Sequence, residues 1–292
     1  MPRLVRAVEA VKIGRVTRFA SCFLLVFAEL AFGGMTAIAV PPFFKVERGF
    51  YKSSASVYLA AGLIPTAGFA LLALRRAEPQ APAATALWLD SGLWLLFCSA
   101  VIVYLVTLWT DHALLRARAY VASLVLGLIG VVATSLTLKP AAFGPLAVAG
   151  YALSGIFSSA VLGFASVGML FGHWYLIDPN LPVDYLRTIV RFLGFALIGE
   201  LIVLFLVVGI MALGGHAATQ ALATLFDSDS ALLGMRLVLG PIASILLAWM
   251  TWQTLKIPQT MAATGLLYIA VMSVLVGEFI GRFILFRTAL PL

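Results

Sequence analysis

Acidic residues inside long apolar runs are the positions at which this sequence could do chemistry. Glu29 lies in the run Phe-Ala-Glu-Leu-Ala, Glu200 in Ile-Gly-Glu-Leu and Glu278 in Val-Gly-Glu-Phe. An ionisable side chain in a membrane interior costs roughly 3 kcal/mol on insertion scales, so it usually faces a partner, water or a ligand. Three such carboxyl groups on separate runs predict a polar core that could relay protons by ordinary acid–base transfer.

Two arginines accompany these acids. Glu278 and Arg282 are four positions apart with the acid first, the order that favours pairing along one helix face. This pair is either an ion pair that lets its helix insert, or the border of a quinone or proton site. Arg236 stands near the start of another apolar run, and we expect it to be an anchor at the membrane interface.

A third group of candidate residues lies at the end of the fifth apolar run. His173, Trp174 and Tyr175 directly precede a polar Asp-Pro-Asn segment, which predicts a position near one membrane face. Such a cluster is typical of an aromatic belt. His173 and Tyr175 could alternatively hydrogen-bond the headgroup of a quinone, because imidazole and phenol exchange protons with quinone oxygens. Both interpretations remain open from the sequence.

The elements that would hold these residues follow from composition. Of the 292 residues, 63% are hydrophobic and 11% are charged, whereas about a quarter of a soluble domain is charged. A helix needs about 20 apolar residues to cross the hydrocarbon layer, so the chain can cross about eight times. We therefore predict an all-α, polytopic transmembrane helix bundle forming a single domain over residues 1–292. The expected spans lie near residues 19–42, 55–74, 84–109, 118–138, 145–176, 188–214, 231–253 and 260–286.

Charged residues and prolines separate the runs. The first run is expected to end at Pro41-Pro42, and Pro241 should kink the seventh helix. The longest polar stretch, residues 214–230, is expected to be a connection. About ten Lys and Arg residues fall on the side of the N-terminus and about eight on the other, which favours both termini in the cytoplasm.

Small residues predict close helix packing along the fifth run. They recur at intervals of four or five positions and would let a neighbouring helix approach along one stripe. The stripe consists of Gly155, Ser159, Gly163, Gly168 and Gly172.

Several other classes of function have no support. The net charge of +7 comes from basic residues at the ends of apolar runs, not from a patch with exposed aromatics, so nucleic acid is not an expected partner. Nucleotide-binding, zinc-protease and serine-hydrolase motifs are not found. Haem is disfavoured because His112 and His216 lie in predicted connections. Cys22 and Cys98 lie in apolar runs without metal-ligand spacing and are expected to be packing residues, so we predict no metal site.

The eighth run contains the sequence Val-Gly-Glu-Phe-Ile-Gly-Arg-Phe over residues 276–283. This segment resembles the GE(L/F)IGR segment in the last helix of dimethyl sulfoxide reductase anchor subunits, which are related to the polysulfide reductase-type quinol-interacting membrane subunits. The resemblance covers at most residues 231–288. It implies a subunit of the bacterial cytoplasmic membrane that tethers an iron–sulfur partner and binds menaquinol.

Only Glu278 and Arg282 carry over from that resemblance. The anchors also use a His and an acidic residue in the first half of the chain, where this sequence has no intramembrane His. Glu29 and Asp90 are the only acids inside the apolar runs of that half.

The leading hypothesis is a membrane anchor subunit of an electron-transfer complex, in contact with membrane lipids. It would bind quinone or menaquinone non-covalently and tether an iron–sulfur or cytochrome subunit, without catalytic residues of its own. A small-molecule or ion transporter is the first alternative, because intramembrane acids also build transport pathways. A purely structural membrane subunit is the second.

Overall fold

The computed structural model describes residues 2–75, 82–257 and 259–292, and the described elements are helical. They are α1 (Pro2–Ala37), α2 (Arg48–Leu74), α3 (Pro82–Thr107), α4 (Ala113–Thr137), α5 (Ala147–Trp174), α6 (Asp184–Leu213), α7 (His216–Ser228), α8 (Ser230–Leu237), a π-helical turn η1 (Val238–Ile242), α9 (Ala243–Lys256) and α10 (Thr260–Thr288). Eight segments of this described part are long and apolar enough to cross a membrane. The predicted all-α, polytopic transmembrane fold is confirmed, and the protein is an integral membrane protein.

Several helix ends differ from the predicted spans. The helices α2, α4 and α6 begin at Arg48, Ala113 and Asp184, four to seven positions before the predicted spans begin. Charged residues can stay within a helix at the membrane surface because their long stems reach back to water. The first span ends at Ala37, before Pro41-Pro42, because the chain turns before the prolines.

The seventh span is interrupted in the middle. Pro241 lies in the π-helical turn between α8 and α9, so the irregularity expected there takes the form of a π-turn, a feature that often occurs at functional sites. The Ser273 hydroxyl of α10 donates a hydrogen bond to the Leu239 carbonyl at 2.5 Å. A neighbouring helix thus supplies a donor where proline disturbs the backbone pattern.

Residues 214–230 form more structure than the expected connection. Most of this stretch is α7, with Ala218, Leu222 and Leu225 buried. These residues recur every three or four positions and face the bundle as one helical stripe. Polar residues between them lower the mean hydropathy of the segment, so hydropathy alone does not reveal the helix.

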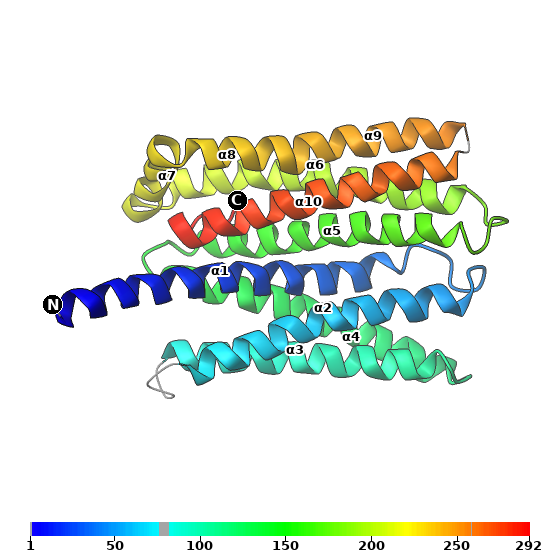
Figure 1. The fold of residues 1–292 in the computed structure, drawn as a ribbon, viewed down its shortest axis with the longest axis horizontal. Helices are drawn as coiled ribbons and strands as arrows, with labels where there is room; N and C mark the ends of the chain where they lie inside the picture. Colours follow the sequence, from blue (N-terminus) through cyan, green and yellow to red (C-terminus); the bar gives the residue numbers. More distant parts are fainter. Residues whose placement is uncertain (1, 76–81, 258) are drawn as a thin grey trace.

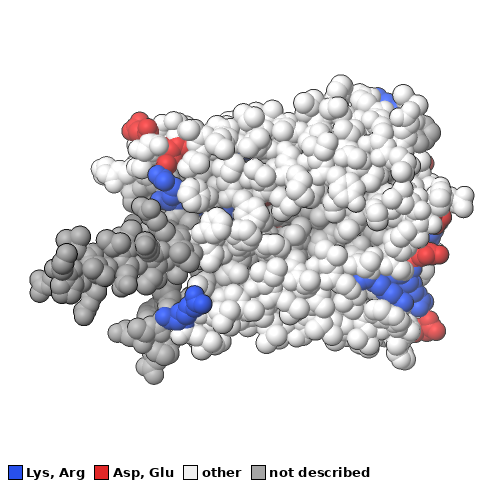
Figure 2. Space-filling view, in the orientation of Figure 1, with Lys and Arg blue, Asp and Glu red and all other residues white. Residues whose placement is uncertain are grey.

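The spanning helices lie side by side with α5 in the middle of the bundle (Figure 1). In that view α1 to α4 lie on one side of α5, and α6, α8, α9 and α10 on the other. The N-terminal end of α1 and the C-terminal end of α10 are at the same end of the bundle (Figure 1). Charged side chains on the visible face gather at the two ends of the molecule and leave an uncharged band between them (Figure 2). This band matches the hydrocarbon layer of a membrane.

A very close helix crossing joins α1 to α5. A Cβ built on Gly163 would lie 2.1 Å from the carbonyl carbon and oxygen of Gly33, and one on Gly33 would lie 1.7 Å from the Ser159 carbonyl oxygen. Only glycines permit the two backbones to approach this closely.

The rest of the small-residue stripe contacts other helices. A Cβ on Gly155 would approach Ser135 of α4, one on Gly168 would approach Leu267, and one on Gly172 would approach Thr264 of α10. The stripe thus packs closely against other helices, and because α5 is central, its successive turns meet different neighbours.

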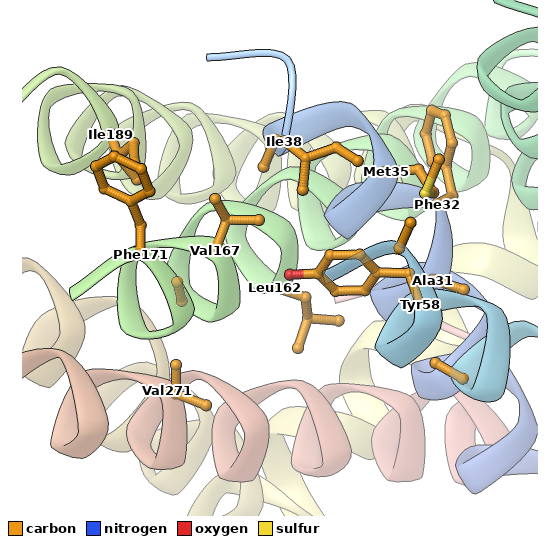
Figure 3. Close-up of a cluster of buried hydrophobic side chains, with 14 of the residues drawn as sticks. Ala31, Phe32, Met35, Ile38, Tyr58, Leu162, Val167, Phe171, Ile189 and Val271 are labelled. Carbon is orange, nitrogen blue, oxygen red and sulfur yellow. The ribbon is translucent and has the colours of Figure 1, made fainter. Parts of the chain in front are cut away.

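Apolar side chains from α1, α2, α5, α6 and α10 fill the space around α5 (Figure 3). The Tyr58 ring of α2 lies between α1 and α5, and its hydroxyl group points toward Leu162 and Val167 (Figure 3). That hydroxyl is 3.0 Å from the Ser166 hydroxyl, which satisfies it within the apolar core.

Candidate functional site

Four of the six predicted site residues meet in one buried charged cluster. Glu29 of α1, Glu200 of α6, and Glu278 and Arg282 of α10 converge there, together with Arg236 of α8. All five side chains are at least 94% buried. We call these five residues the charged cluster.

Arg282 joins α10 to α1. Its Nε donates to Glu29 Oε2 at 3.0 Å, and its Nη2 lies 2.8 Å from Glu29 Oε1. Of these two contacts only the first is a hydrogen bond, and the second is an attraction between opposite charges at short range. The predicted pairing of Arg282 with Glu278 along α10 is longer, at 3.8 Å, so the stronger contact is made between helices.

Arg236 joins α8 to α6 and α10 through a single nitrogen. Its Nη2 donates to Glu278 Oε1 at 3.0 Å and to Glu200 Oε1. The two carboxyl groups therefore lie side by side on the same guanidinium nitrogen. Arg236 is 2% exposed, so the prediction that it is an interfacial anchor is wrong. It lies six positions after the start of α8, and the π-helical turn begins two positions after it.

Two serines of α5 complete the hydrogen bonding of Arg282. Ser154 accepts a bond from Nη1 at 3.2 Å, and Ser158 accepts one from Nη2. The two hydroxyls are four positions apart and so lie on one face of α5. A guanidinium has five N–H donors. The two serine hydroxyls accept from N–H groups of Arg282 that do not donate to Glu29.

The chain after α10 folds back beside the cluster. Ala289 adopts a left-handed backbone conformation with a φ of 59°, and its carbonyl accepts a hydrogen bond from the Tyr151 hydroxyl. Pro291 and Leu292 then line a cavity of about 10 Å³ next to Arg236. Among the residues that the structure describes, none is a hydrogen-bond partner of the Nε or Nη1 atom of Arg236.

A larger apolar cavity lies near the cluster between α1, α2, α5 and α10. It measures about 240 Å³, and Leu30, Tyr58, Ser166 and Val274 are among its lining residues. Leu30 follows Glu29 directly, and Val274 is one helical turn from Glu278. The rim residue Met272 is 58% exposed, so the cavity opens toward the lipid-facing surface.

The two remaining candidates, His173 and Tyr175, lie elsewhere. At 1.5 Å per residue, His173 is roughly 22 Å along α5 from Ser158. His173 is exposed, and its Nδ1 is 3.4 Å from the Tyr268 hydroxyl. Tyr175 is buried and donates to the Pro182 carbonyl at 2.7 Å. Burial raises the pKa of the Tyr175 phenol, which keeps it protonated. The two side chains therefore engage different partners.

Asp90 is a buried acid outside the cluster. It accepts hydrogen bonds from Thr134 at 3.2 Å and Thr137 at 3.3 Å. It therefore fastens α3 to α4. Within the part of the chain that the structure describes, no group of His, Cys, Asp and Glu side chains has the arrangement of a metal site.

Sequence reasoning missed three members of this site. Arg236 has the pattern of an interfacial residue, and Ser154 and Ser158 look like ordinary small packing residues. Their four-residue spacing on α5 is a weak signal, because it identifies one helix face but not its partner.

Neither a protein-family model nor a curated protein sequence matches the chain.

Proposed function

We propose that the chain is a quinone-interacting membrane anchor subunit of an electron-transfer complex in the bacterial cytoplasmic membrane. In this proposal a partner subunit carries iron–sulfur clusters or haems, and both termini of the chain face the cytoplasm. The observation that carries the proposal is the charged cluster, which is built on the Gly-Glu-Phe-Ile-Gly-Arg segment of α10 and lies near a cavity open toward lipid.

The charge balance of the cluster supports a proton-exchanging role. Three carboxyl groups face two guanidinium groups, so the cluster carries one excess negative charge when every group is ionised. An uncompensated charge in a membrane interior is expensive, and one bound proton makes the cluster neutral. Glu200 and Glu278 are the natural pair to share that proton, because both contact Nη2 of Arg236.

The apolar cavity fits the ring of a quinone. Its volume of about 240 Å³ is lined almost entirely by apolar groups, and its opening would leave an isoprenoid tail in the lipid. Tyr58 and Ser166 are among its lining residues, but their hydroxyl groups hydrogen-bond each other and the Gly163 carbonyl, so the cavity would hold the quinone ring by apolar contacts. A bound quinone would supply two-electron, two-proton redox chemistry. The charged cluster would hold or release one of those protons.

The close packing around the cluster favours this role over transport. The cavity beside Arg236, at about 10 Å³, has room for about one water molecule. The crossing of Gly33 with Gly163 closes the space between α1 and α5. A substrate pathway through the cluster would require the small cavity beside Arg236 to widen and the helices α1 and α5 to separate at their crossing.

The first experiment is purification of the tagged full chain from its native membrane in mild detergent. Co-purifying proteins would be identified by mass spectrometry, and bound quinones would be extracted and quantified. We expect a stoichiometric iron–sulfur or cytochrome partner together with quinone. A chain that has neither would overturn the proposal, and proton or solute flux in liposomes containing this chain alone would assign a transport function instead.

A second experiment tests the role of the cluster in the assembled complex. The double variant Glu278→Gln/Arg282→Gln removes one charge of each sign, so the formal charge of the cluster stays the same. We expect quinol-dependent turnover to fall at least about 100-fold, as for loss of a proton-transfer group. Reduction of the partner subunit by a soluble artificial donor should be unchanged.

The matched control is Asp90→Asn, which alters a buried acid that lies outside the cluster. It should retain quinol-dependent turnover. If the double variant also retains turnover while the complex assembles, the cluster is structural and the quinone proposal fails.

A further inference from the structure

A groove on the outer surface of the bundle lies between α6 and α9. Its volume is about 290 Å³. The α6 side is formed by Val190, Arg191, Gly194 and Ile198, and the α9 side by Ile245, Ala248, Trp249 and Trp252. Each set recurs at helical spacing and so forms one face of its helix. Val190 and Ala248 are 2% and 5% exposed, whereas Ile198 and Trp249 are 51% and 57% exposed, so the groove has a buried floor and exposed walls.

One cation stands in this groove without an acidic partner. Arg191 is exposed, and its guanidinium carbon lies 5.5 Å from the centre of the Trp252 ring. Within residues 2–75, 82–257 and 259–292, no carboxylate forms an ion pair with it. The nearby Asp184 pairs with Arg187 at 2.7 Å.

Two other arginines at the same end of the bundle are already engaged. Arg48 is 3.3 Å from Asp111, and Arg187 also donates to the Leu255 carbonyl at 2.7 Å. Arg191 instead has an aromatic ring on one side, and its charge remains available. Lys256, which ends α9 one turn beyond Trp252, adds a second exposed positive charge.

We propose that this groove binds an anionic phospholipid. The headgroup phosphate pairs with Arg191, whose planar guanidinium suits phosphate geometry. Lys256 adds electrostatic attraction near the surface. One acyl chain lies along Gly194 and Ala248, where small residues leave the floor of the groove open. At 1.5 Å per residue, Arg191 is roughly 10 Å along α6 from Asp184, a depth from which a long side chain reaches the headgroups.

This inference is independent of the proposed function. It follows from the combination of an apolar groove with a cation that no carboxylate of the described residues neutralises. A lysine or arginine near the membrane surface gains attraction to anionic lipids that corresponds to about a fivefold change in affinity.

The test uses the full chain in mild detergent after lipid removal. The chain would be titrated separately with phosphatidylglycerol and phosphatidylcholine, and bound lipid counted by native mass spectrometry. We expect saturable binding of phosphatidylglycerol in clear preference to phosphatidylcholine. Arg191→Gln should weaken phosphatidylglycerol binding about fivefold.

A second variant tests the groove without changing charge. A Cβ on Gly194 would meet no atom within 4 Å, so Gly194→Leu should fold normally while filling the path of the acyl chain. It should also weaken phosphatidylglycerol binding. Arg48→Gln, which removes a paired arginine at the same end of the bundle, is the control and should bind as the parent chain does. Equal binding of the two lipids, or unchanged binding by both groove variants, would overturn the proposal.

Discussion

Arg282 holds Glu29 from a position 253 residues later in the chain, through a hydrogen bond of 3.0 Å and an ion contact of 2.8 Å. The first and last spanning helices are thereby fastened together inside the bundle. Removing one partner of a buried ion pair leaves the other uncompensated and typically costs about 3–5 kcal/mol. We expect Arg282→Gln to lower the stability of the chain by this order, measured as thermal unfolding in detergent.

Two further variants test whether the loss of stability arises because Glu29 is left without a positive partner. Adding Glu29→Gln to Arg282→Gln should recover part of the stability, because both members of the pair are then neutral. Arg48→Gln disrupts the pair with Asp111, whose side chain is 95% exposed. It should change the free energy of unfolding by at most about 1 kcal/mol. A double variant no more stable than Arg282→Gln would contradict this account.

Gly163 should tolerate no side chain. A Cβ there would lie 2.1 Å from the Gly33 backbone, so Gly163→Val must push α1 away from α5. We expect poor folding or a markedly lower yield of monodisperse protein by size-exclusion chromatography. Gly209→Ala, at a helical position where a Cβ meets nothing within 4 Å, should behave as the parent chain. Normal folding of Gly163→Val would show that the crossing is looser than described.

Ser273 should stabilise the π-helical turn. Its hydroxyl bonds the Leu239 carbonyl on the neighbouring helix. Interhelical hydrogen bonds in membranes contribute about 0.6 kcal/mol on average, and we expect Ser273→Ala to lower stability by about that amount. The comparison is Ser99→Ala, because Ser99 bonds only Leu95 on its own helix at 2.8 Å. The difference between the two variants in chemical denaturation gives the interhelical contribution, and equal losses would refute it.

The charged cluster should contain a protonated carboxylic acid at neutral pH. Charge balance requires one proton among Glu29, Glu200 and Glu278, and infrared spectroscopy detects it as a carbonyl stretch sensitive to deuterium exchange. Glu200→Gln leaves two carboxylates facing two guanidiniums, so we expect that band to disappear. The same band should persist in Asp90→Asn. A band that survives in Glu200→Gln would place the proton elsewhere.

The transmembrane fold could be predicted from composition and run length, because lipid admits almost only helices at such lengths. The ends of α2, α4 and α6 could not be placed as well, since charged residues continue a helix into the headgroup region. Helix α7 could not be predicted from hydropathy, because the mean hydropathy of a short amphipathic helix is similar to that of a polar loop.

The acidic members of the charged cluster were predictable because each stands out as an expensive group in an apolar run. Their meeting was not, because the sequence places Glu29, Glu200 and Glu278 on three helices without fixing how the helices are rotated. Arg236 illustrates this limit. Its position near the start of the seventh span predicts a side chain at the membrane interface. In the structure the side chain instead points into the bundle, where two carboxylates compensate its charge.

The sequence by itself determined that the chain crosses the membrane about eight times and that a few carboxyl groups must be satisfied within it. Only the tertiary structure decided which cation pairs with each acid of the charged cluster and that His173 lies apart from the cluster. It also decided that Arg191 lies beside a groove with no carboxylate partner among the described residues. The cost of burying a charge can be recognised from the sequence, because it depends on an ionisable residue standing inside an apolar run. The identity of its partner depends on helix rotation and depth, which packing between distant segments fixes.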